Sequence, residues 1–171
     1  MRVVTTLLIG LVIAGCGGSA ETGGPLVRSI DDALAALSDE LALDDPDLFE
    51  VAIDLDGVTL VLAETEIDAD TGDVTGSFAT AYRWQDGVIN RAGTPAPADG
   101  ALFRASTIAV DPDRIFERIR DELDDPDIVD LVIQGGPDGT TVIDATVVNE
   151  RGGTLLVLLG SDGAILGVQA G

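Results

Sequence analysis

Two stretches of the chain, eighty positions apart, are nearly identical and constrain the fold more than any other feature. Residues 44–53 read DDPDLFEVAI, and residues 124–133 read DDPDIVDLVI. Each has a proline at its third position, which cannot continue a helix, and each goes on into branched and apolar residues that favour a strand. A repeat at a fixed offset predicts that the chain contains two copies of one supersecondary unit.

The sequence around each copy predicts which elements that unit contains. Apolar residues recur at helical spacing over residues 30–41, directly after the N-cap candidate Ser29. Asp111 and Pro112 are typical of the cap and first position of a second helix. After each helix, apolar runs alternate with Asp-Gly and other turn sequences, which indicates antiparallel hairpins. We therefore expect an α+β fold, formed by a tandem duplication of a helix followed by a four-stranded antiparallel meander.

The start of the chain has the pattern of an export signal. Arg2 precedes an uncharged apolar run over residues 3–14, which is shorter than the roughly 20 residues needed to span a membrane. The four residues that end at Cys16, IAGC, resemble the lipobox of bacterial lipoproteins. That resemblance implies acylation of Cys16, cleavage before it, and a lipid anchor in the cell membrane with the folded part on the extracytoplasmic face. The other interpretation is an ordinary signal peptide with a chance cysteine.

These patterns divide the chain into five segments. The boundaries follow the leader, a stretch rich in Gly and small polar residues, and the two repeats with a Pro- and Gly-rich connection between them. The expected segments are the lipoprotein signal peptide (1–15), a tether (16–28), the first repeat with its helix and antiparallel sheet (29–92), a linker and lead-in (93–110), and the second repeat with its helix and antiparallel sheet (111–171).

Composition argues against most kinds of catalysis. The chain has no His, its nine basic residues are all Arg, and Cys16 is its one cysteine. If Cys16 is acylated, no thiol is left as a nucleophile or metal ligand, and the usual general bases and Schiff-base amines are missing as well. We expect a protein that is not an enzyme and that needs no cofactor or metal.

The charge of the chain limits its partners. With 31 acidic residues the formal net charge is −22, which repels phosphate backbones and anionic headgroups. We therefore expect no nucleic-acid partner. The expected partners are the membrane, through the N-terminal lipid, and an extracytoplasmic protein.

One segment of the first half resembles a known family. Residues 66–74 read EIDADTGDV and are similar to the strand-turn-strand signature of PepSY-type domains, over about residues 29–76. The resemblance implies an extracytoplasmic module that holds or inhibits peptidases. The second half departs from the signature, because Val148 and Asn149 stand where the family has Asp and Ala.

Two other interpretations apply to the same aspartates. Asp-Thr-Gly at residues 70–72 is also the nucleophile motif of aspartic proteases, but it is followed by the charged Asp73 and has no second copy in the other half. Ca²⁺ binding is an alternative to solvated turns, although the spacing does not match an EF-hand loop. The candidate Ca²⁺ ligands are Asp54, Asp56, Asp68, Asp70 and Asp73.

The aromatic residues of the first half are the candidate binding residues. Strand alternation puts Phe78, Tyr82 and Trp84 on one face, where they either pack under the first helix or form an exposed binding stripe. In the second half both strand faces of residues 155–159 are apolar, so one helix cannot cover them all.

Two functions follow from these patterns. The first is a membrane-anchored, non-catalytic binding or regulatory module, PepSY-like in its first half, that uses an uncovered sheet face or an edge strand. The alternative is a carrier of lipid or of a small apolar ligand, with the surplus leucines and valines lining a cavity.

Overall fold

The structure, a computed structural model, describes residues 27–123, 126–149 and 151–171. The expected signal peptide and Cys16 lie outside these residues, as do Asp124 and Asp125 of the second repeated stretch. Among the described helices, none has both the length and the apolar character required to cross a bilayer.

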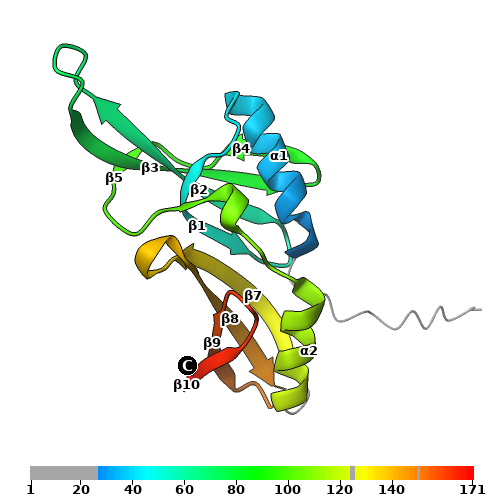
Figure 1. The fold of residues 1–171 in the computed structure, drawn as a ribbon. Coiled ribbons are helices and arrows are strands. Elements are labelled where there is room, and N and C mark those ends of the chain that lie inside the picture. The colour runs from blue at the N-terminus through cyan, green and yellow to red at the C-terminus, as the bar shows by residue number, and fades with distance from the viewer. Residues whose placement is uncertain (1–26, 124–125, 150) are drawn as a thin grey trace, which may run out of the picture.

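The described chain consists mostly of β-strands, with two α-helices and three short 3-10 helices (Figure 1). In chain order the elements are η1 (Val27–Ser29), α1 (Ile30–Leu41), β1 (Asp47–Ile53), β2 (Val58–Ile67), β3 (Val74–Gln85), β4 (Val88–Arg91), β5 (Ala96–Pro97), β6 (Phe103–Arg104), η2 (Ala105–Thr107), α2 (Pro112–Glu122), β7 (Pro126–Gly135), η3 (Pro137–Gly139), β8 (Thr141–Asn149), β9 (Thr154–Gly160) and β10 (Ile165–Ala170).

All of these strands belong to one antiparallel sheet. Its main path has the order β10-β9-β8-β7-β1-β2-β3-β4, with β5 paired to β3 and β6 paired to β1. The two repeated stretches meet at the centre of this path, where Ala52 of β1 lies opposite Val132 of β7. The pairing of β1 with β7 therefore joins the strands of the two halves of the chain into a single sheet.

The expected α+β fold with a tandem helix-plus-meander duplication is wrong. The fold is β-rich, with 49% of the residues in strands and only two short helices, of 12 and 11 residues. Two separate meanders would leave the outer backbone groups of β1 and β7 unpaired, and direct pairing of these strands satisfies both edges. The connection between the halves also contributes two strands, β5 and β6, that the sequence did not predict.

The first helix covers the expected residues 30–41, but a different feature ends it. Ser29 is at the N-cap position as expected, but its side chain makes no capping hydrogen bond. The helix stops where Ala42 adopts a left-handed conformation (φ 53°) and its N–H bonds to the carbonyl of Ser38. Because this cap precedes Pro46 by four residues, the proline is not what ends the helix.

The second helix begins as predicted. The Asp111 carboxylate accepts a hydrogen bond from the Arg114 N–H at 3.2 Å, and Pro112 occupies the first turn, where no N–H is needed. The N-terminal ends of the two helices are linked by an exposed ion pair between Arg28 and Asp113.

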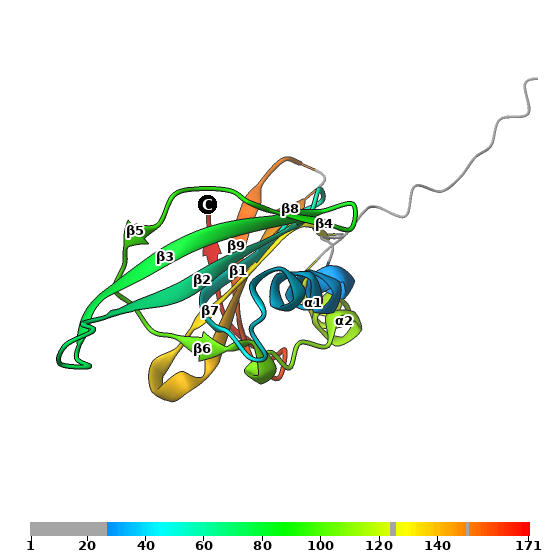
Figure 2. The ribbon, with the colours of Figure 1, turned by 90° about the horizontal axis from the view of Figure 1, so that it is seen from above.

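The core lies between the sheet and the two helices, which cover the same face (Figure 2). The buried residues of the long strands share this face: Leu48, Val51, Ile53, Val58, Leu60, Leu62, Thr80, Tyr82, Ile128, Leu131, Ile133, Thr141, Ile143, Ala145, Val147, Val157 and Leu159. Ile30, Ala33 and Leu37 of α1 and Ile115 and Ile119 of α2 pack against them. The two halves of the sheet thus share one hydrophobic core.

A substitution at the centre of this sheet should destabilise the whole protein. Leu131 of β7 is fully buried opposite Ile53 of β1, so Leu131→Ala should lower the free energy of unfolding by about 2–5 kcal/mol. Urea denaturation followed by circular dichroism measures this change. As a control, Leu55→Ala should change it by less than about 0.5 kcal/mol, because Leu55 is 52% exposed. Two separate unfolding transitions, with only one affected, would contradict a shared core.

Candidate functional site

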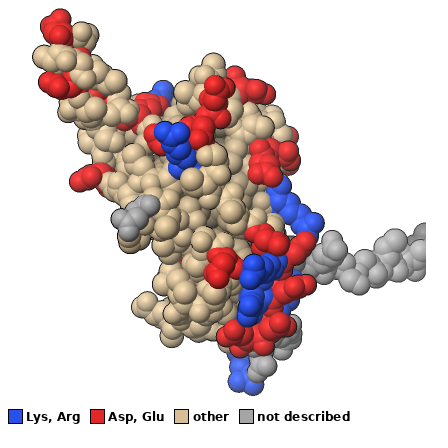
Figure 3. Space-filling model, in the orientation of Figure 1, with Lys and Arg blue, Asp and Glu red and all other residues tan. Residues whose placement is uncertain are grey.

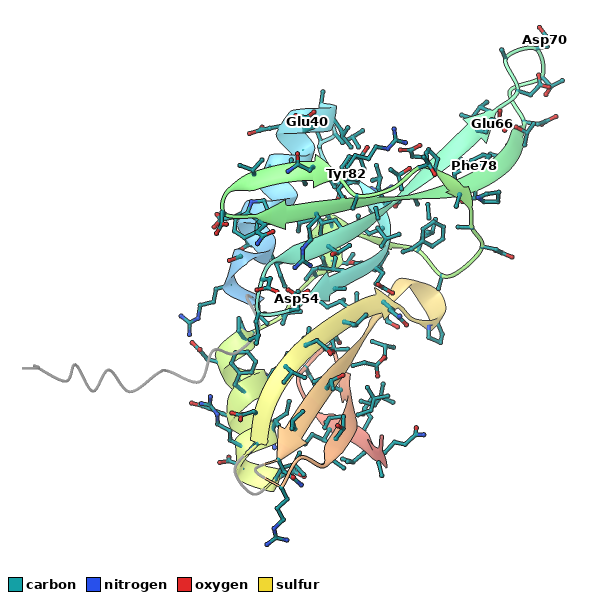
Figure 4. The ribbon with its side chains drawn as sticks, turned by 180° about the vertical axis from the view of Figure 1, so that it is seen from behind. Glu40, Asp54, Glu66, Asp70, Phe78 and Tyr82 are labelled. Atoms are coloured by element: carbon teal, nitrogen blue, oxygen red, sulfur yellow. The ribbon has the colours of Figure 1, made fainter. Side chains whose placement is uncertain are left out.

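The sheet face opposite the helices is not covered by any described residue, and we call it the open face. Figure 4 views the molecule from this side. The pairing register assigns alternate side chains of the strands to it, and each is half-buried or exposed. Small and branched apolar residues make up much of it: Ala52, Val61, Ala63, Ala79, Ala81, Val132, Val142, Leu156 and Leu158.

Polar side chains divide this apolar surface into patches. Gln134 Nε2 donates to Glu50 Oε2 at 3.0 Å across the central strands. Asp130 and Asp144 lie on the same face. A surface that mixes apolar and hydrogen-bonding groups in this way suits a protein partner better than an acyl chain, because an acyl chain would leave these polar groups without hydrogen bonds.

Arg83 and Asp54 form an ion pair on the open face that is held by several hydrogen bonds. Arg83 Nη2 lies 2.6 Å from Asp54 Oδ1, and Arg83 Nη1 donates to Thr59 Oγ1 at 3.0 Å. Asp54 Oδ1 also accepts from the N–H groups of Asp56 and Gly57, at 2.8 and 2.9 Å. The hydrogen bond from Arg83 is the main cause that lowers the pKa of Asp54, while partial burial acts in the opposite direction. These contacts fix the turn between β1 and β2.

The Asp-Thr-Gly segment forms a hairpin turn between β2 and β3. Asp68 Oδ1 accepts from the N–H groups of Asp70 and Thr71, at 2.8 and 3.0 Å, and Gly72 has the positive φ (75°) that such a turn requires. The hydrogen bond from the Thr71 N–H is the largest cause of the lowered pKa of Asp68. The carboxylate of Asp68 therefore closes the turn.

The two groups of turn aspartates are separated in space. Asp54 and Asp56 precede β2, and Asp68, Asp70 and Asp73 follow it, so the length of the strand lies between them. Within the residues that the structure describes, no three His, Cys, Asp or Glu side chains are grouped so that they could hold a metal ion.

The three aromatic candidates lie on the helix-covered face rather than on the open face. Tyr82 is buried (7% exposed) beside the first helix, and Trp84 packs against the core. Phe78 lies farther out along β3 and is half-buried, and its ring covers Gly76, where an added Cβ would lie 3.0 Å from Cε2. The structure therefore does not bring the three rings together as one exposed stripe.

Sequence reasoning missed the residues of the open face in the first half. In the sequence, Val61 and Ala63 alternate with Leu60 and Leu62, but both sets are apolar, so the pattern does not show which set is buried. Small residues such as Ala79 and Ala81 do not indicate a binding site by their chemistry. In the second half, Leu156 and Leu158 are on the open face, as the doubly apolar pattern indicated.

The chain matches no protein-family model, no curated protein and no solved structure.

The pair of Arg83 and Asp54 should give stability that depends on pH. Because the pKa of Asp54 is lowered in the folded state, its contribution is present above the usual value of 3.8 and is lost as the pH falls through the folded value. Arg83→Met should lower the free energy of unfolding by about 0.5–1 kcal/mol at pH 7, since both groups are partly exposed. Urea denaturation at pH 7 and at pH 3 tests this.

The difference in the free energy of unfolding between Arg83→Met and the unmodified protein should shrink from pH 7 to pH 3, because the Asp54 carboxyl group of the unfolded chain takes up its proton as the pH falls below 3.8. Arg91→Met on β4 is the control, because Arg91 is exposed and makes no ion pair among the described residues. An effect of Arg83→Met that is the same at both pH values would show that the ion pair is not its cause.

Proposed function

We propose that the chain is a bacterial lipoprotein, anchored by lipid on Cys16, whose folded part is a non-catalytic binding or regulatory module on the extracytoplasmic face of the cell membrane. The observation that carries the binding role is the open face. It spans strands from both halves of the chain and exposes apolar side chains that a monomer without a partner gains nothing by exposing.

The lack of catalytic groups supports a binding role over an enzymatic one. No His or Lys is available as a general base, and the carboxyl groups with a shifted pKa among the described residues (Asp45, Asp54 and Asp68) are all shifted downward. A carboxyl group that acts as a general acid or base near neutral pH needs a raised pKa. These carboxylates serve as hydrogen-bond acceptors in turns and loops.

The partner that best fits the open face is an extracytoplasmic protein. Its bound surface would cover Val61, Val132 and Leu158 and offer donors to Asp130 and Asp144. A peptidase is the kind of partner that the PepSY resemblance implies. The alternative proposal, a carrier of lipid or of a small apolar ligand, would need an apolar cavity rather than an open surface with carboxylates on it.

Replacement of Cys16 should prevent lipid modification of the chain. In a bacterial host, Cys16→Ser should abolish incorporation of a labelled fatty acid, because serine has no sulfur for the acyl chain. Labelling and membrane fractionation measure this outcome. Ser19→Ala, three residues farther on, is the control and should leave labelling unchanged. Equal labelling of the two variants would reject the lipoprotein assignment.

A photoreactive residue on the open face should crosslink to a protein. Placed at Val132 in the membrane-bound chain, it should give a discrete protein adduct on illumination, because this position lies at the centre of the exposed surface. The same residue at Glu117, exposed on α2, is the control and should give none. Adducts with lipid alone would favour the carrier, and no adduct at all would contradict a binding role for this face. Gel electrophoresis and mass spectrometry identify the products.

A further inference from the structure

The hairpin of β2 and β3 extends beyond the rest of the sheet as a two-stranded arm, residues 64–76 (Figure 1). β1 pairs with β2 only as far as Leu62, so the outer edge of β2 has no neighbouring strand over residues 64–67 in the described part of the chain. Backbone N–H and C=O groups along such an edge are available to another extended segment. The arm is thus a place where a partner can add as a strand.

The end of the arm exposes an apolar pair. Ile67 and Val74 lie opposite each other in the pairing register, and their exposed fractions are 60% and 66%. No described helix or strand packs over this part of the hairpin, as the views in Figures 1 and 2 show. The pair adds nothing to the hydrophobic core but can bury an apolar side chain of a partner.

The arm carries charge of one sign. It contains no Arg or Lys, and acidic side chains surround its end in the space-filling view (Figure 3). None of these carboxylates forms an ion pair with the described part of the chain. They are Glu64, Glu66, Asp68, Asp70 and Asp73. Edge strands are commonly protected by lysine, whereas this edge is flanked by carboxylates that attract a basic segment.

We propose that the arm is a docking site for an extended basic segment of a partner protein. The segment adds to the free edge of β2, places its Arg or Lys side chains beside Glu64 and Glu66, and buries an apolar side chain against Ile67 and Val74. This site is separate from the open face, because it lies on the part of the hairpin that extends past the sheet. Either surface can therefore fail its test without the other.

Selection from a displayed library of short random peptides tests the proposal on the full chain in mild detergent. Enriched peptides should combine Arg or Lys with an aliphatic residue, and their binding can be measured with the synthetic peptides by fluorescence anisotropy. Glu64→Lys with Glu66→Lys should weaken binding by about tenfold or more, because these charges face the basic side chains. Glu117→Lys with Asp121→Lys changes the net charge equally at exposed positions of α2 and should leave binding within about twofold.

A second pair of variants tests the apolar contact. Ile67→Ser with Val74→Ser should weaken binding by about tenfold, because the buried apolar area is lost. Leu55→Ser with Val88→Ser removes two apolar side chains of similar exposure (52% and 57%) elsewhere and should have little effect. Circular dichroism confirms that all four variants remain folded.

Three outcomes would overturn the proposal. They are no enrichment, enrichment of peptides without basic residues, and equal weakening by the arm variants and their controls. If Val132→Lys weakens peptide binding and the arm variants do not, the peptides bind to the open face and not to the arm. If the arm binds as expected but Val132 gives no protein adduct in cells, the proposed role of the open face fails and the arm remains.

Discussion

The pairing of β1 with β7 is the interaction on which the rest of the structure depends. Each strand comes from a different half of the chain, and each would otherwise be the edge of its own small sheet. Their pairing satisfies two edges at once and places Val51 opposite Ile133 and Ile53 opposite Leu131 in one core. Because both halves then present their apolar residues on the same side, both helices lie on that side. The opposite side is left as one continuous surface.

Local features of the fold could be predicted from the sequence because their causes are local. β1 and β2, and likewise β3 and β4, are joined at Asp-Gly sequences as expected, since such turns and alternating residues define a hairpin within a few positions. Asp111 and Pro112 mark the start of α2 for the same reason. The joining of the halves could not be predicted, because it pairs strands about eighty residues apart and no short pattern encodes such a contact. β5 and β6 have only two residues each and depend on β3 and β1 for their extended conformation.

The residues of the open face were also hard to predict from the sequence. Aromatic side chains such as Tyr82 stand out in a sequence because they often bind ligands, yet burial under a helix uses the same side chains. The open face depends on which of two alternating sets, Val61 and Ala63 or Leu60 and Leu62, faces the helices. That choice is made by the register with neighbouring strands and by helix packing, so it is visible only in the assembled sheet.

The strong negative charge of the chain opposes the association of two copies through their uncovered apolar faces. Two copies that approach through their open faces bring together net charges of −22 each, and Asp130 and Asp144 on the faces themselves add local repulsion. In the proposed lipid-anchored chain, the same repulsion acts between the folded part and anionic lipid headgroups. A basic partner is attracted by the same negative charge that repels a second copy of the chain. Screening limits this attraction to about 8 Å at physiological salt, so it operates where carboxylates are concentrated and accessible, as on the arm. In the proposed complexes, charge therefore selects the partner, and apolar burial at Ile67, Val74 and the open face stabilises its binding.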